Sequence, residues 1–126
     1  MSGPQGGPLT GQRVLLVEDE FLIAMAIEAC LVDAGATVVG PAKSVAEASA
    51  RLAEAPTLAV LDYRLARDET SLPVARDLAA RGVPFLFHTG NATPEELHAQ
   101  FANVPVLTKP CAEPDMIDAC AALIGG

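Results

Sequence analysis

Short apolar runs and helix-like patterns alternate along most of the chain. Residues 14–17 and 58–61 are continuous aliphatic runs that each stop at an acidic residue, which is typical of strands covered on both faces. Residues 37–40, 84–87 and 104–107 form three further short apolar runs. We therefore predict five short strands.

Segments with apolar residues at helical spacing separate and follow these runs. They cover residues 21–34, 44–55, 72–80, 93–102 and 116–124. Ser44 with Glu47, and Thr93 with Glu96, have the spacing of a capping box, which marks where two of these helices begin. Strand and helix patterns thus alternate five times. This alternation predicts an α/β domain, a doubly wound parallel sheet with helices on both faces.

The length and composition suit a single domain of this kind. The chain has 126 residues, of which 51% are apolar and only 4% aromatic, so its core must be largely aliphatic. Residues 1–12 are rich in Gly and Pro and have no periodicity. We predict a flexible tail over residues 1–12 and one domain over residues 13–126.

The charge and the cysteines argue against several classes of protein. The formal net charge is −8 and there is no Lys/Arg run, so we expect no nucleic-acid binding. The three cysteines have neither a disulfide framework nor metal spacing. There is no signal-peptide pattern and no apolar run of about 20 residues that could span a membrane. We expect a cytoplasmic protein that does not enter membranes.

Polar side chains stand at the carboxyl ends of four predicted strands. Glu18 and Asp19 follow the first strand, Asp62 the third, Thr89 the fourth and Lys109 the fifth. Each of these residues alone could belong to an ordinary turn or helix cap. The specific signal for a functional site is that all of them fall at strand ends, in this order. Since ligands of open α/β sheets bind at the carboxyl ends of the strands, we expect these side chains to share one crevice.

The residue types in this crevice indicate phosphoryl chemistry. Three carboxylates would repel one another, and Mg²⁺, which prefers oxygen ligands and phosphate oxygens, would relieve that repulsion. Asp62 is the candidate nucleophile, because carboxylates form acyl phosphates. Asp19 and Asp62 would bind the metal, with Glu18 helping directly or through water. Lys109 and the Thr89 hydroxyl would hold phosphoryl oxygens.

Taken together, four segments resemble the receiver domain of two-component response regulators. They are residues 14–20 (VLLVEDE), 61–65 (LDYRL), 89–90 (TG) and 107–110 (LTKP). The resemblance covers residues 13–124. It implies the flavodoxin-like (βα)5 fold, with a five-stranded parallel sheet in the order 2-1-3-4-5.

The resemblance also implies a role for each site residue. Asp62 matches the phosphoacceptor, and Asp19 the direct metal ligand of an acidic pair with Glu18. The backbone carbonyl of Arg64 matches the third protein ligand of Mg²⁺. Thr89 matches the switch hydroxyl. Lys109 matches the site lysine, and the bond from Lys109 to Pro110 is expected to be cis.

Three features depart from the usual receiver pattern. Val106 stands where receivers carry Tyr or Phe, so the usual aromatic switch cannot operate. The loop over residues 66–71 has no Gly. The sequence Phe87-His88-Thr89-Gly90 resembles a receiver subgroup with a Phe-x-Thr-Gly motif and no aromatic switch. We expect His88 to point away from the side chain of Thr89 and to pack beneath the fourth helix.

The leading hypothesis is a stand-alone receiver that accepts a phosphoryl group from a histidine kinase or a phosphotransfer protein. It would signal by contact with a downstream protein, through the face formed by the last two helices and the fifth strand, or act as a phosphorelay shuttle or sink. It would not be an enzyme in the ordinary sense. One alternative is a pseudo-receiver that binds partners without phosphorylation. Another is an aspartyl phosphatase, which is disfavoured because such enzymes want an acid where this chain has Arg64.

Overall fold

The computed structural model describes residues 7–90 and 94–125, which form a five-stranded parallel sheet. The strands are β1 (Arg13–Val17), β2 (Thr37–Ala42), β3 (Leu58–Leu61), β4 (Phe85–Thr89) and β5 (Val106–Thr108). Their order is β2-β1-β3-β4-β5, which confirms the predicted topology. Val17 lies beside Leu61, and Leu61 beside Phe87, so strands 1, 3 and 4 end at the same edge of the sheet.

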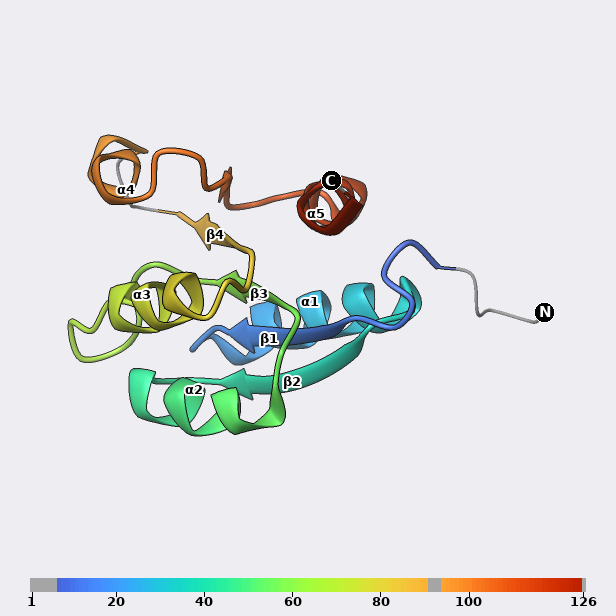
Figure 1. Cartoon of the computed structure of the whole chain (residues 1–126), viewed down its shortest axis with the longest axis horizontal. Coiled ribbons are helices and arrows are strands. Elements are labelled where there is room, and N and C mark those ends of the chain that lie inside the picture. The colour runs from blue at the N-terminus through green and yellow to red at the C-terminus, as the bar shows by residue number, and fades with distance from the viewer. Residues whose placement is uncertain (1–6, 91–93, 126) are drawn as a thin grey trace.

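Helices cover both faces of this sheet. They are α1 (Phe21–Asp33), α2 (Val45–Arg51), α3 (Leu72–Ala80), α4 (Pro94–Gln100) and α5 (Glu113–Gly125). Figure 1 shows α1 and α5 on one side of the sheet, and α2, α3 and α4 on the other. Within the described residues, no helix is both long and apolar enough to cross a membrane.

The alternation of side chains along each strand divides the core into two clusters. Leu15, Leu61 and Phe87 belong to the cluster under α2 and α3. Leu16 and Leu86 belong to the cluster under α1 and α5. Both faces of the strands are therefore apolar, which explains why the sequence shows continuous runs rather than alternation.

All the aromatic rings except that of Phe21 gather on the side of the sheet that carries α3 and α4. Phe85 lies edge-on to Phe87 at 5.8 Å between ring centroids, and to Phe101 at 5.4 Å. Tyr63 lies edge-on to Phe87 at 6.2 Å. Such edge-to-face pairs are favourable beyond the area that they bury. They fix the end of β4, and with it the position of Thr89.

The capping box that begins α2 is present. The Oγ of Ser44 accepts a hydrogen bond from the Glu47 backbone N–H at 3.1 Å, and the Glu47 carboxylate accepts one from the Lys43 N–H at 3.0 Å. The carboxylate thus reaches one residue further back than in the standard box. The second expected box begins at Thr93, which lies outside the described residues.

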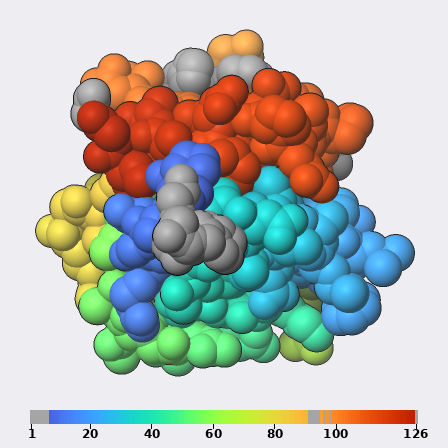
Figure 2. Space-filling model, turned by 90° about the vertical axis from the view of Figure 1, so that its right-hand side faces the viewer, coloured from blue at the N-terminus to red at the C-terminus, as the bar shows by residue number. Residues whose placement is uncertain are grey.

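The chain packs against the domain before residue 13. The side chain of Leu9 is 0% exposed and belongs to the core under α1 and α5. The Leu9 N–H donates to the Ala34 carbonyl at 2.8 Å, at the end of α1. In Figure 2 this segment, in blue, lies against α1 and below α5. The packed part therefore begins earlier than the expected boundary, at least from Gly7.

Candidate functional site

The structure brings the predicted site residues together at the carboxyl edge of the sheet. A cavity of about 180 Å³ lies there, lined by Asp19, Glu20, Asp62, Arg64, Thr89, Gly90 and Lys109. Glu18 is buried beside it and contacts Lys109. The strand order dictates this convergence, because β1, β3, β4 and β5 all end at this edge.

Lys109 is the centre of the electrostatic arrangement. Its Nζ donates a hydrogen bond to Asp62 Oδ2 at 3.1 Å and lies 3.1 Å from Glu18 Oε1. A third carboxylate, that of Glu20, lies 3.5 Å from Nζ and is mostly exposed. Glu18 Oε1 is fully buried and has no hydrogen-bond partner among the described residues. Its contact with Nζ is an ion pair without hydrogen-bond geometry. The crevice therefore has an unsatisfied oxygen that a further cation could use.

Burial dominates the protonation of the two inner carboxyls. Burial, followed by the negative charge of Asp62, raises the pKa of Glu18 to about 7. It also raises the pKa of Asp62, although the hydrogen bond from Lys109 opposes this shift. Burial alone would lower the pKa of Lys109, but its hydrogen bonds and charge interactions with Asp62 and Glu18 outweigh burial and leave it raised. The acidic groups thus need more positive charge than one lysine supplies.

The carboxylates fit a hard divalent cation. Glu18, Asp19 and Asp62 each offer an oxygen, and these oxygens lie within 4.8 Å of one another. Among the described residues, no other set of three acidic, histidine or cysteine side chains is this close. Oxygen donors, partial burial and excess negative charge are the features that Mg²⁺ sites require.

Arg64 contributes to the crevice differently from the acids. Its guanidinium lies 5.5 Å from the centroid of the Tyr63 ring, a cation–π contact at the rim. The residue pairs with Thr70 in an isolated antiparallel bridge. Its backbone carbonyl as a metal ligand stays a prediction.

The loop after β3 turns without glycine. Arg67 and Asp68 have φ values of 62° and 60°, in the left-handed region that glycine usually occupies. The turn is closed by a hydrogen bond from the Leu65 N–H to the Glu69 carbonyl at 2.8 Å. The Glu69 carboxylate accepts a hydrogen bond from the Val45 N–H at 3.1 Å. This loop is therefore tied to the start of α2.

Sequence reasoning missed the contacts of Glu20 and Glu69. Glu20 belongs to the acidic run after β1, and that run was the available signal for its place in the cavity. Glu69 gave no such signal, because its contact depends on the path of the loop.

His88 is buried on the other side of the sheet from the one expected. We expected it beneath α4, but it lines a cavity with Ile27 of α1 and Met116 of α5. The expectation was wrong because alternation places His88 on the same side as Leu86, whereas α4 covers the side of Phe87. Burial, followed by the charge of Lys109, lowers the pKa of His88 to about 4.

Two other expectations concern strand β5 and the proline after it. The bond between Lys109 and Pro110 is cis, which confirms the prediction. The bond between Gly40 and Pro41 is also cis, which was not predicted. Val106, in place of an aromatic residue, pairs with Phe87 and packs at the edge of the core under α3.

Comparisons with known proteins gave matches among solved structures alone. No family model and no curated protein matches the chain. SdrG from Sphingomonas melonis Fr1 is 41% identical, over 94% of this chain and 98% of that one, with a TM-score of 0.78. The REC domain of the PhyR response regulator from Erythrobacter litoralis is 28% identical, over 94% of each chain, with a TM-score of 0.81.

A longer protein is also similar. The response regulator PhyR from Brucella abortus is 33% identical over 93% of this chain, with a TM-score of 0.75. This chain covers 49% of that protein.

Proposed function

The chain belongs to the receiver domains of response regulators, and from this premise we propose that it accepts a phosphoryl group on Asp62 in a Mg²⁺-dependent reaction. The observation that carries the proposal is the position of Lys109 Nζ, 3.1 Å from Asp62 within a crevice that holds two further carboxylates. This combination supplies a nucleophile, a cation ligand set and a phosphoryl-binding ammonium in one place.

The proposed reaction is a direct transfer to a carboxylate oxygen. An Asp62 oxygen forms a bond to phosphorus while the bond from phosphorus to a donor nitrogen breaks. The donor is protonated on its other ring nitrogen, so it takes the electron pair of the broken bond and leaves as a neutral imidazole. Mg²⁺, held by Asp19, Asp62 and the Arg64 carbonyl with Glu18 beside it, would neutralise charge on the phosphoryl oxygens.

The remaining side chains orient the phosphoryl group. Lys109 would exchange its hydrogen bond with Asp62 for one with a phosphoryl oxygen, since its ammonium is mobile and has three donors. Thr89 is 3% exposed at the end of β4, and its hydroxyl would donate to another oxygen. Gly90 leaves the mouth of the crevice open, because the atom nearest to a Cβ there would be the Lys109 stem at 3.8 Å.

The phosphodonor is proposed to be a histidine kinase or a histidine phosphotransfer protein. The start of α1, directly after the acidic residues of β1, exposes apolar side chains that a protein donor could cover. Phe21 is 67% exposed, Leu22 77% and Met25 50%. Exposed apolar surface of this size at the rim of a reactive site favours a protein partner over a small substrate.

The output is proposed to be contact with a downstream protein or transfer within a phosphorelay. We propose no turnover of external phosphate esters, since Arg64 stands where a phosphatase would have its second acid and turns to the Tyr63 ring. A cytoplasmic setting is supported by three free cysteines, which fit a reducing compartment.

A pseudo-receiver that binds partners without phosphorylation is the second candidate. Val106 favours it, because a half-buried valine on β5 lacks the ring that usually couples the site to the surface. The convergence of Asp19, Asp62 and Lys109 argues against it, because a binding module has no need of an acid cluster with an unsatisfied oxygen.

Intact-mass measurement separates these two candidates. The chain is incubated with Mg²⁺ and phosphoramidate, which has the phosphorus–nitrogen bond of a phosphohistidine, or with acetyl phosphate. We expect one added phosphoryl group, which is lost in Asp62→Asn and in EDTA. Asp68→Asn, which neutralises an exposed acid in the neighbouring loop, is the matched control and should still be phosphorylated.

Binding of Mg²⁺ is followed in parallel through the fluorescence of Tyr63, the sole tyrosine in a chain without Trp. Tyr63 is next to Asp62 and 5% exposed, so the metal should change its emission. Mg²⁺ binding without an adduct from either donor would contradict phosphoryl acceptance and support the pseudo-receiver.

A further inference from the structure

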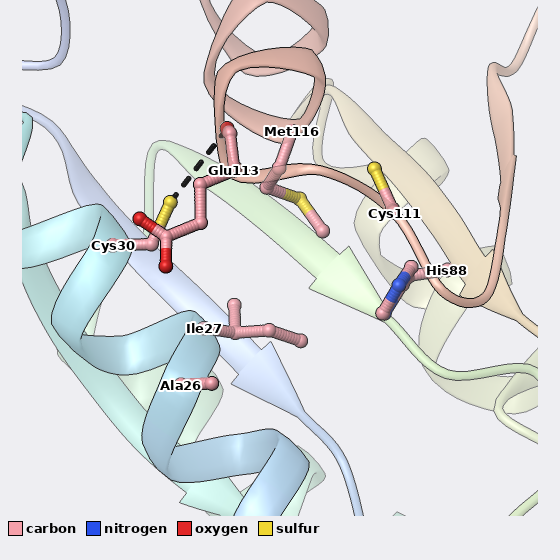
Figure 3. A pocket seen from close by; sticks show the side chains of 7 residues that line it. All are labelled: Ala26, Ile27, Cys30, His88, Cys111, Glu113 and Met116. Carbon is pink, nitrogen blue, oxygen red and sulfur yellow. Dashed lines mark hydrogen bonds between the residues drawn. The ribbon is translucent and has the colours of Figure 1, made fainter.

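A second cavity lies behind the acid crevice, on the α1 and α5 side of the sheet. Its volume is about 60 Å³. Figure 3 shows the side chains around it, which come from α1, β4, the loop after β5, and α5. Cys30, His88, Cys111 and Met116 all line this cavity, so an imidazole and three sulfur atoms share its wall.

His88 is the first observation that indicates a ligand. It is 5% exposed, and neither of its ring nitrogens has a hydrogen-bond partner within the part of the chain that the structure describes. Buried polar groups are almost always satisfied, so such an imidazole needs an explanation. Because its pKa is lowered, the ring is neutral near pH 7 and has a free lone pair. Figure 3 shows the ring extending into the cavity.

The sulfur atoms are the second, independent observation. The chain has three Cys and three Met, and two of the cysteines and one methionine line this one cavity. Cys111 is partly buried on the loop after β5, where its thiol donates a hydrogen bond to the Ala112 carbonyl at 3.4 Å, and Met116 is 3% exposed on α5. Thiolate and thioether sulfur, together with imidazole, are ligands that select soft cations over Mg²⁺.

The spacing of the donors decides between soft metals. A structural Zn²⁺ site has four ligands in a closed tetrahedron. Apart from the acid crevice, no three His, Cys, Asp or Glu donors among the described residues lie within 4.8 Å of one another. A preformed four-ligand Zn²⁺ site is therefore absent from this part of the chain. This cavity therefore suits a cation that needs only two or three soft ligands.

We propose that this cavity binds one soft monovalent cation of the Cu(I) type, ligated by an imidazole nitrogen of His88 and the sulfur of Cys111, with Met116 as the third ligand. Binding replaces the Cys111 S–H bond with an S–Cu bond and releases the proton to solvent, and copper stays Cu(I). The thiolate and the monovalent cation together are neutral, which suits a cavity otherwise lined by Ala26 and Ile27.

This site is distinct from the proposed phosphorylation site but adjacent to it in the chain. His88 precedes Thr89, and Cys111 follows Lys109 by two residues. A bound cation would join β4 to the loop that carries Lys109. The proposal does not rest on phosphorylation of Asp62.

The test is anaerobic titration of the reduced, metal-free full chain with Cu(I), delivered as its acetonitrile complex, in competition with the chelator bathocuproine disulfonate. We expect one Cu(I) retained per chain, with an affinity that rises with pH because a proton is released. Cys111→Ser should weaken binding more than about 100-fold, beyond the effect of outer-shell residues. Met116→Leu should weaken it by roughly 10-fold.

Two controls make the result specific. Met25→Leu removes a thioether that is 50% exposed on α1 outside the cavity, and it should bind as the wild type does. Saturating Mg²⁺ should leave Cu(I) binding unchanged, whereas competition would place Cu(I) in the acid crevice and overturn the proposal.

The role of His88 is read by nitrogen NMR on the wild-type chain, which avoids dependence on a variant that might not fold. One ring nitrogen of His88 should shift on addition of Ag(I), a redox-stable analogue of Cu(I), with His98→Gln assigning the signal. An unshifted His88 signal, or equal retention of Cu(I) by wild type and Cys111→Ser, would overturn the proposed ligand set.

Discussion

At the scale of single residues, the acid crevice makes stability depend on pH. In the absence of metal, burial and the charge of Asp62 raise the pKa of Glu18 from 4.5 to about 7. The folded chain then holds this proton more tightly than the unfolded chain. The stability that it contributes is complete below about pH 4.5 and is lost as the pH rises through about 7.

The Gln side chain of Glu18→Gln stays neutral at every pH. We therefore predict that, in EDTA, the free energy of unfolding of this variant rises relative to that of the wild type by on the order of 2 kcal/mol as the pH goes from about 5 to 8. The comparison with the variant is necessary because His88 also makes stability depend on pH. Its pKa is lowered to about 4, so its contribution to stability rises with pH between about 4 and 6.5, opposite to that of Glu18. The measurement is urea unfolding at a series of pH values. A constant difference between the two proteins would show that Glu18 is charged in the fold throughout.

The site residues could be predicted because topology places them. Strand ends of a parallel sheet share one edge, so Asp62, Thr89 and Lys109 needed only the strand order to converge. The contact of Glu20 with Lys109 could not be predicted, because it depends on a side-chain rotamer at the rim. The surroundings of His88 depend on which helices cover each face of the sheet. We placed His88 beneath α4, which was wrong, because it lies on the face that α1 and α5 cover.

At the scale of elements, the start of α2 has two independent caps. The Ser44 hydroxyl satisfies the Glu47 N–H, and the Glu69 carboxylate satisfies the Val45 N–H from a different loop. We predict that Ser44→Ala lowers the free energy of unfolding by about 1 kcal/mol, as is usual for loss of an N-cap. Ser49→Ala, at an exposed interior position of α2, should be neutral or slightly stabilising. Urea unfolding measures both, and equal effects would contradict the capping role.

The boundaries of the elements show where sequence patterns lose resolution. Helix α3 covers the predicted residues 72–80, because an apolar stripe and Gly82 mark it clearly. β4 was predicted over residues 84–87 but extends to Thr89, and β5 was predicted over 104–107 but covers Val106–Thr108. The ladder continues through the pair Thr89 and Thr108. In the sequence, the polar residues at these positions look like the ends of the strands. Only the pairing between β4 and β5 shows that both strands continue.

At the scale of the whole molecule, α1 joins the core to the surface. Its inner side packs on the sheet and on the N-terminal segment through Leu31 and Ala34. Its outer side remains apolar, with Leu22 and Met25 exposed. Glu28 and Asp33 are the charged residues of this helix, so most of its surface is apolar, and exposed apolar surface favours a partner that covers it. The inner side therefore serves folding, and the outer side is available to the proposed phosphodonor.

A pair of leucine variants separates these two roles. Leu9 is 0% exposed in the core beside α1, so Leu9→Ala should lower the free energy of unfolding by about 2–4 kcal/mol. Leu22 is 77% exposed, so Leu22→Ala should change it by less than about 0.5 kcal/mol. The same Leu22→Ala protein should take phosphoryl from acetyl phosphate as the wild type does, but more slowly from a phosphorylated protein donor. If Leu9→Ala were as stable as the wild type, the N-terminal segment would not be part of the core, and the domain would begin at β1.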